Sequence, residues 1–136
     1  MAIANRRDES ISPKKKELIM GAGIIPALQT PIPGVNPHIE GKGLALMYEE
    51  LDEIAEELGV PAITELGDAY TEEDGETPWY DASKGLLTIA ALITYIETNP
   101  EAIDERDWIL ADLKETEEIL KAAEEHGVKF CFTMVM

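Results

Sequence analysis

The chain has 136 residues, a length typical of one domain, and 45% of them are hydrophobic, so apolar burial can offset the conformational entropy lost on folding. Its formal net charge of −17 is uneven, because residues 1–20 hold five basic and three acidic residues whereas residues 21–136 hold six and twenty-five. An acidic body repels phosphate backbones and anionic lipid headgroups, which argues against nucleic acid and membrane surfaces as partners.

The single cysteine, Cys131, cannot form an internal disulfide, and the first residues lack the continuous apolar stretch of a secretory signal. The longest uncharged apolar run, residues 85–96, is shorter than the ~20 residues that a membrane-spanning helix needs. These features predict a cytoplasmic protein without a transmembrane segment.

The sequence of residues 1–41 predicts a tail, then a strand, then a loop. Residues 1–17 mix charges without apolar periodicity, which predicts a mobile basic tail, and residues 18–136 are expected to form one acidic globular domain. Within that domain, residues 18–25 form an apolar run that predicts a strand ending at Pro26. The next segment, residues 26–41, holds four of the eight prolines and therefore predicts a long extended loop.

A first helix is predicted over residues 44–58, where apolar residues recur at helical spacing. Gly59 is expected to end this helix in a left-handed cap, and residues 60–66 then read as a short strand. The apolar stripe of the predicted helix consists of Leu44, Met47, Leu51, Ile54, Ala55 and Leu58.

Two more helices and a strand are expected in the second half. The second helix begins near Asp81 or Ser83 as a capping residue, runs to about residue 97, and is apolar around nearly its whole circumference, which is typical of a central or interface helix. Asn99 and Pro100 are expected to start the segment of a third helix, which Gly127 ends. The alternating pattern of residues 128–136 predicts a terminal strand.

The predicted fold class is therefore α+β, with three helices packed mainly on one face of a small sheet of about three strands. The element order is strand, helix, strand, helix, helix, strand. A homodimer that forms through the terminal strand or the second helix is a further hypothesis.

The most unusual feature is a run of thirteen carboxylates between residues 43 and 83 without a single Lys or Arg. Six of them lie opposite the apolar stripe of the first helix, where all are expected to face water. Carboxylates four residues apart there repel each other by about 0.2–0.5 kcal/mol per pair. Such a conflict with local stability is typical of functional surfaces, but charge runs are more often only solvated faces, so a solubilising face or adaptation to a salty cytoplasm is the simpler explanation.

The functional hypothesis is a surface that docks a basic protein partner, as in a small inhibitor or immunity-type protein. Trp79 either anchors the partner or covers the first turn of the second helix. The predicted partner-binding residues are Glu49, Glu50, Asp52, Glu53, Glu56, Glu57, Glu72, Glu73, Asp74 and Trp79.

The alternative is a small carboxylate- or metal-dependent hydrolase with Glu40, Asp68 or Asp81 as acid and base. No motif names a cofactor or a metal. The acidic loop around Gly75 fails the register of a calcium loop, and the His38–Glu40 pair lacks the cysteines of a zinc deaminase. The sequence therefore predicts no cofactor and no assigned catalytic residue.

Overall fold

The computed structural model describes residues 23–67 and 78–135. The predicted tail and the acidic loop of residues 68–77 lie outside them. The elements, in chain order, are strand β1 (Gly23–Leu28), helix α3 (Lys42–Leu58), the short 3₁₀ helix η1 (Thr64–Leu66), helix α4 (Ala82–Thr98), helix α5 (Arg106–His126) and strand β2 (Phe130–Val135).

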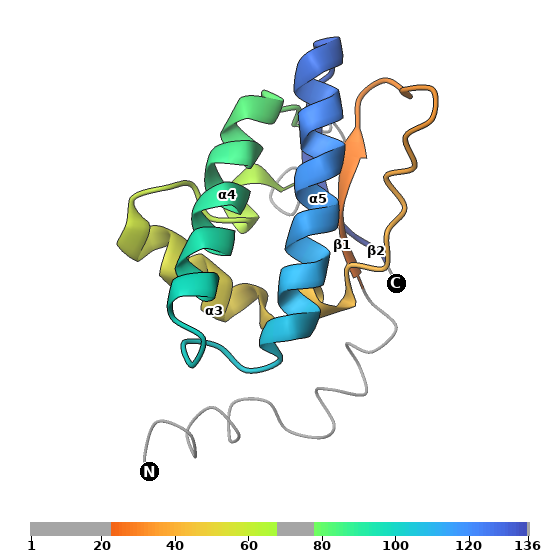
Figure 1. Cartoon of the computed structure of the whole chain (residues 1–136). Coiled ribbons are helices and arrows are strands. Elements are labelled where there is room, and N and C mark those ends of the chain that lie inside the picture. Colours follow the sequence, from red (N-terminus) through yellow and green to blue (C-terminus); the bar gives the residue numbers. More distant parts are fainter. Residues whose placement is uncertain (1–22, 68–77, 136) are drawn as a thin grey trace.

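The fold is α+β, with three long helices beside an antiparallel pair of strands (Figure 1). In the ladder, Gly23 of β1 is opposite Val135 and Leu28 is opposite Phe130, so the two ends of the described chain meet in one sheet. The predicted class is confirmed, but within residues 23–67 and 78–135 the sheet has two strands rather than about three.

The strand predicted over residues 60–66 is wrong, because η1 forms there. Ile63 and Leu66 both bury their side chains, a spacing of three residues that suits a 3₁₀ turn and not a strand. Strand-like pairing is limited there to one isolated parallel bridge, between Gly67, which follows η1, and Phe132.

β1 does not end at Pro26 as predicted but continues through it to Leu28. The N–H of Ile24 points to the outer edge of the strand, where it donates to the carbonyl oxygen of Gly41 at 3.0 Å. Backbone direction alternates along a strand, so the nitrogen of Pro26 faces the same outer edge and no bond to β2 is lost.

α3 begins and ends at glycines with left-handed backbone angles. Gly59 has φ of 75° and its N–H donates to the carbonyls of Ala55 and Glu56, which confirms the predicted cap. Gly41 precedes the helix with φ of 60°, and a Cβ there would collide with the carbonyl oxygen of Ile24. The entry of α3 is thereby held against β1.

α4 and α5 pack against each other, α5 also packs against β1, and α4 is buried on one side. Asp81 occupies the expected N-cap position of α4, but its side chain accepts no capping hydrogen bond. Asn99 caps the other end, since its N–H donates to the carbonyl of Tyr95 at 2.9 Å, and α5 begins only at Arg106, later than expected. Gly127 ends α5 as predicted.

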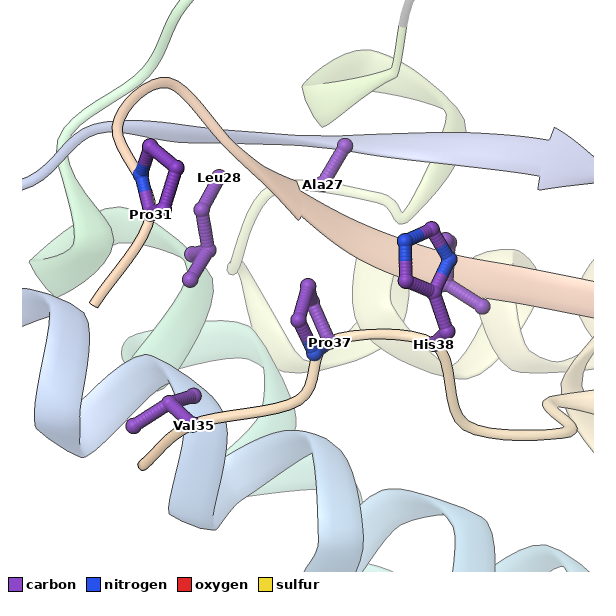
Figure 2. A pocket seen from close by; sticks show the side chains of 7 residues that line it. Ala27, Leu28, Pro31, Val35, Pro37 and His38 are labelled. Atoms are coloured by element: carbon purple, nitrogen blue, oxygen red, sulfur yellow. The ribbon is translucent and has the colours of Figure 1, made fainter. Parts of the chain in front are cut away.

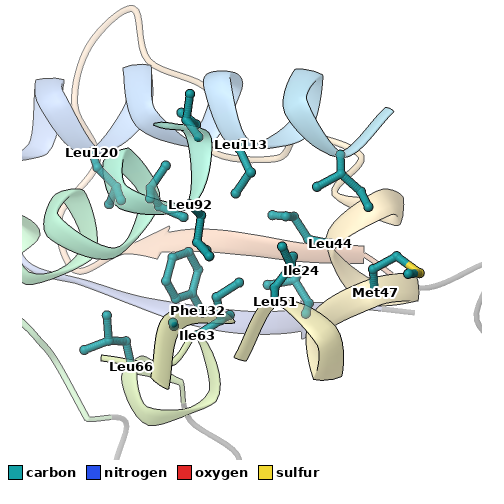
Figure 3. Packing of buried hydrophobic residues seen from close by; sticks show 14 of the residues in the cluster. Ile24, Leu44, Met47, Leu51, Ile63, Leu66, Leu92, Leu113, Leu120 and Phe132 are labelled. Carbon is teal, nitrogen blue, oxygen red and sulfur yellow. The ribbon is translucent and has the colours of Figure 1, made fainter. Parts of the chain in front are cut away.

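The core lies between the helices and the sheet (Figure 3). Gly85 of α4 allows the ring of Phe130 to approach the helix backbone closely, and Phe130 stacks edge-on against Phe132 with ring centroids 5.0 Å apart. No helix in the described ranges is both long and apolar enough to cross a bilayer. The largest fully buried side chains are those of Phe130, Leu44, Met47, Leu51, Ile63, Ile89, Leu92, Ile96, Ile109, Leu113, Leu120 and Thr88.

Candidate functional site

The carboxylates of α3 form a surface on the side of the helix opposite the core. Leu44, Met47 and Leu51 are fully buried, which fixes the rotation of the helix and directs the opposite arc toward solvent. α3 contains one basic residue, Lys42 at its start. Its last turn contains none that could offset the charge of the carboxylates. We call this surface the acidic face, and it consists of Glu49, Glu50, Glu53, Glu56 and Glu57.

Four of the five residues of the acidic face are exposed, and Glu50 is half-buried. Successive carboxylates at Glu49, Glu53 and Glu57 lie one helical turn apart, about 6 Å at the Cβ atoms. The acidic face is therefore a dense line of negative charge along one edge of the molecule.

Asp52, the sixth acidic residue of the predicted set, has a structural role. It is half-buried, and its two carboxylate oxygens accept hydrogen bonds of 2.8 Å from the N–H of Ile63 and the hydroxyl of Thr64. Burial raises the pKa of this carboxyl above its ordinary value, although both hydrogen bonds oppose the shift. Asp52 ties η1 to α3, so the expectation that it faces water is wrong.

Asp112 fixes the other end of α3, and the sequence analysis missed it. It lies on α5, is only 4% exposed, and its Oδ2 accepts hydrogen bonds from the N–H groups of Gly43 (2.8 Å) and Leu44 (3.3 Å). Gly41, the N-cap residue of α3, provides no side-chain cap of its own. Asp112 therefore caps α3 from another helix and places a negative charge at its positive end.

The contact with Asp112 requires a glycine at position 43, and burial raises the pKa of the Asp112 carboxyl. A Cβ on Gly43 would lie 2.9 Å from Oδ2 of Asp112, so only glycine allows this contact without displacement. Burial raises the pKa of Asp112, the hydrogen bonds from Leu44 and Gly43 lower it, and the charges of Glu115 and Glu40 raise it further. One signal was present in the sequence, because Asp112 lies among the apolar residues of α5, between Ile109 and Thr116.

Of the other predicted partner-binding residues, the structure describes Trp79 alone. Trp79 is half-buried just before α4, and its neighbour Tyr80 pairs with Phe130 through backbone hydrogen bonds of 2.8 and 3.0 Å. The acidic loop residues Glu72, Glu73 and Asp74 lie outside the described residues.

The carboxylates proposed for a hydrolase do not come together among the residues that the structure describes. Glu40 is exposed, lies beside Gly23 and is 3.8 Å from Lys42, whereas Asp81 follows Tyr80 at the opposite end of the ladder. Six residues of strand separate those ends by roughly 16 Å. Asp68, the third candidate, lies outside the described part.

Neither Glu40 nor Asp81 belongs to a group of possible metal ligands among the described residues. Within residues 23–67 and 78–135, no three His, Cys, Asp or Glu side chains cluster as metal ligands would. Figure 2 shows a pocket of about 320 Å³ between β1 and the proline-rich segment, with His38 as its one titratable side chain. It is lined by Ile25, Ala27, Leu28, Pro31, Val35, Pro37 and His38.

His126 and Cys131 have structural explanations. The ring Nδ1 of His126 lies 2.9 Å from the carbonyl oxygen of Ala122, at the C-terminus of α5, where a cation is favoured. Cys131 is fully buried in β2, as a structural thiol would be. Neither residue adds a catalytic group to the acidic face.

Comparisons with known proteins do not extend this description. No family model, no curated protein and no solved structure matches the chain. The geometry of the described residues is the basis for a functional proposal.

Proposed function

We propose that this protein is an interaction module that binds a basic protein partner through the acidic face of α3. The observation that carries the proposal is the density of like charge: Glu53, Glu56 and Glu57 are exposed on the same helix face as Glu49 and Glu50, and residues 43–83 contain no Lys or Arg. Complementary charge of this kind increases the rate of association and selects against acidic partners.

Hydrogen bonds on either side of Met47, where the backbone of α3 departs from helical angles, also support the proposal. Asp112 holds the first turn of the helix, and the hydrogen bonds of Asp52 to Ile63 and Thr64 hold its second half. Because the helix is fixed before it binds, little conformational entropy is lost when its charges meet a partner.

The surface suits a protein that covers a cationic cleft. A line of exposed carboxylates along a helix is the complement of a groove lined by Lys and Arg, such as those that bind phosphate groups. An inhibitor or immunity-type protein would use it in this way. The hydrolase alternative gains no support from the separated positions of Glu40 and Asp81.

The first experiment recovers the partner. Native mass spectrometry of the protein isolated from its own cells at low salt is expected to show a complex with a basic protein. Its dissociation constant should rise steeply with salt, because ions screen exposed charges within about 10 Å at 0.1 M ionic strength. A dissociation constant that salt does not change would contradict the proposal.

A matched pair of variants then tests the acidic face itself. Glu53→Gln/Glu56→Gln/Glu57→Gln is expected to weaken binding of the recovered partner by about 10–100-fold, since several charge pairs are lost together. The control Glu118→Gln/Glu124→Gln/Glu125→Gln removes the same charge from exposed positions on α5. Equal effects of the two triple variants would show that net charge matters and the acidic face does not.

A further inference from the structure

α4 presents an apolar stripe that the core does not cover. Leu87 is 57% exposed, and Leu58, which ends α3 beside it, is 39% exposed. These two residues lie on a pocket of about 540 Å³ that follows α4, and we call it the α4 groove. The α4 groove is lined by Leu58, Leu87, Ala90, Ala91, Thr94, Tyr95 and Thr98.

The shape of the α4 groove fits a helix. Its residues on α4 recur at intervals of three and four, so they form one continuous stripe about 16 Å long, from Leu87 to Thr98. The middle of the stripe consists of small side chains, including Ala90, Ala91 and Thr94, between the larger Leu58, Leu87 and Tyr95. Small residues along one helix allow a second helix to approach closely.

The charge around the α4 groove is negative at the α3 end. Glu56 and Glu57, both exposed, directly precede Leu58 in the last turn of α3. The last turn of α3 contains no basic residue, so the partial negative charge of that helix C-terminus adds to the charges of Glu56 and Glu57. Lys84, the single cation on α4, lies one turn before Leu87 and does not line the groove.

We propose that the α4 groove binds an amphipathic helix of the basic partner. The apolar side chains of that helix fill the groove, and Lys or Arg residues beside them pair with Glu56 and Glu57. This inference rests on the proposed function, because both surfaces then contact one partner across the end of α3. It adds that the partner presents a helix of about three turns with apolar residues at positions i, i+3, i+4 and i+7.

A second copy of this chain is a poorer occupant. Each copy has a formal charge of −17, so two copies that met at the groove would bring Glu56 and Glu57 near further carboxylates. Repulsion between like charges disfavours that pairing. In Figure 1, α5 lies between α4 and β1, so β1 does not cover the outer side of α4.

Synthetic peptides test the proposal with the full-length protein. The probe is a peptide of about 14 residues with four leucines on one helix face and lysines on the other, long enough to span the groove. Its control is a scrambled peptide of the same composition that has no apolar face. The amphipathic peptide should bind at least about tenfold more tightly by fluorescence anisotropy. Equal binding of the two peptides would overturn the proposal.

Variants of the α4 groove locate the binding. Ala91→Gln fills the middle of the groove without a change of charge and is expected to weaken the amphipathic peptide about tenfold. Ala111→Gln is the control at an exposed position on α5 and should leave binding unchanged. Lys84→Glu should tighten binding, because it extends the negative charge along the groove. Unchanged binding by Ala91→Gln would overturn the proposal.

The two proposals can fail separately. If the Glu53/Glu56/Glu57 triple variant loses the natural partner while Ala91→Gln retains both partner and peptide, the acidic face is the interface and the α4 groove is not. If the triple variant retains the partner, the proposed function itself fails. A dimer in sedimentation that Ala91→Gln dissociates would show that a second copy occupies the groove, which overturns this inference.

Discussion

Asp112 illustrates how one side chain positions a surface that it does not belong to. Its carboxylate is buried on α5, yet it satisfies two N–H groups at the start of α3 and so helps to orient the acidic face. The two hydrogen bonds lower its pKa, but burial has the larger effect, and the folded protein holds the proton of Asp112 more tightly than the unfolded chain does.

The raised pKa of Asp112 predicts how its contribution to stability changes with pH. A raised folded-state pKa means that the stabilisation from the bound proton is fully present below the unfolded value and is lost as pH rises through the folded value. The free energy of unfolding of the wild type, relative to Asp112→Asn, should therefore increase as pH falls from neutrality toward the ordinary aspartate range. Urea unfolding of both proteins across that range measures the difference.

An exposed aspartate provides the control for that pH series. Asp107 is almost fully exposed and bonded only to its neighbour Arg106 in the described contacts, so Asp107→Asn should show no such trend. If acidification reduced the stability of the wild type relative to Asp112→Asn, the burial of Asp112 would not be the dominant effect.

At the level of elements, Trp79 and Tyr80 connect the start of α4 to β2. The bridge between Tyr80 and Phe130 holds this segment against the sheet, and Trp79 is half-buried beside it. Trp79→Ala should lower the free energy of unfolding by about 1–2 kcal/mol, less than a fully buried Trp, if the ring covers the helix start. Unchanged stability together with lost partner binding would instead make Trp79 an anchor residue.

The sequence predicted the elements whose local pattern agrees with their packing. The apolar stripe from Leu44 to Leu58 and the glycine at 59 were sufficient to predict α3 and its end. The segment at residues 60–66 was not predictable in this way, because Asp52, a residue of another element, stabilises η1. Contacts between residues far apart in the chain, such as Asp112 with Gly43, leave little trace in a local pattern.

For the whole molecule, repulsion between the like charges of the acidic face lowers the free energy of unfolding. Glu49 and Glu53, Glu53 and Glu57, and Asp52 and Glu56 are like-charged pairs four residues apart on α3. Glu53→Gln/Glu56→Gln/Glu57→Gln should therefore raise the free energy of unfolding by about 1 kcal/mol at low salt. This increase in the free energy of unfolding should diminish as salt is added, because ions then screen the repulsion in the wild type.

Urea unfolding at low and high salt measures this change, and the α5 triple variant again serves as the control. A triple variant on α3 that is less stable than the wild type would mean that these glutamates stabilise the fold. The acidic face would then have a structural explanation, and the proposed function would lose its main support.

The pairing of β1 with β2 has a consequence for synthesis of the protein. Among the described residues β1 pairs along its length with β2 alone, so this ladder cannot form until residues 130–135 have left the ribosome. The hydrogen bond from Gly43 that caps the N-terminus of α3 likewise cannot form until Asp112 has been synthesised. Helices can form earlier from local contacts, but the ladder closes over more than 100 residues of chain, and such distant pairing is slow. During that interval the apolar side chains of β1 depend on the growing chain, or on a chaperone, for cover.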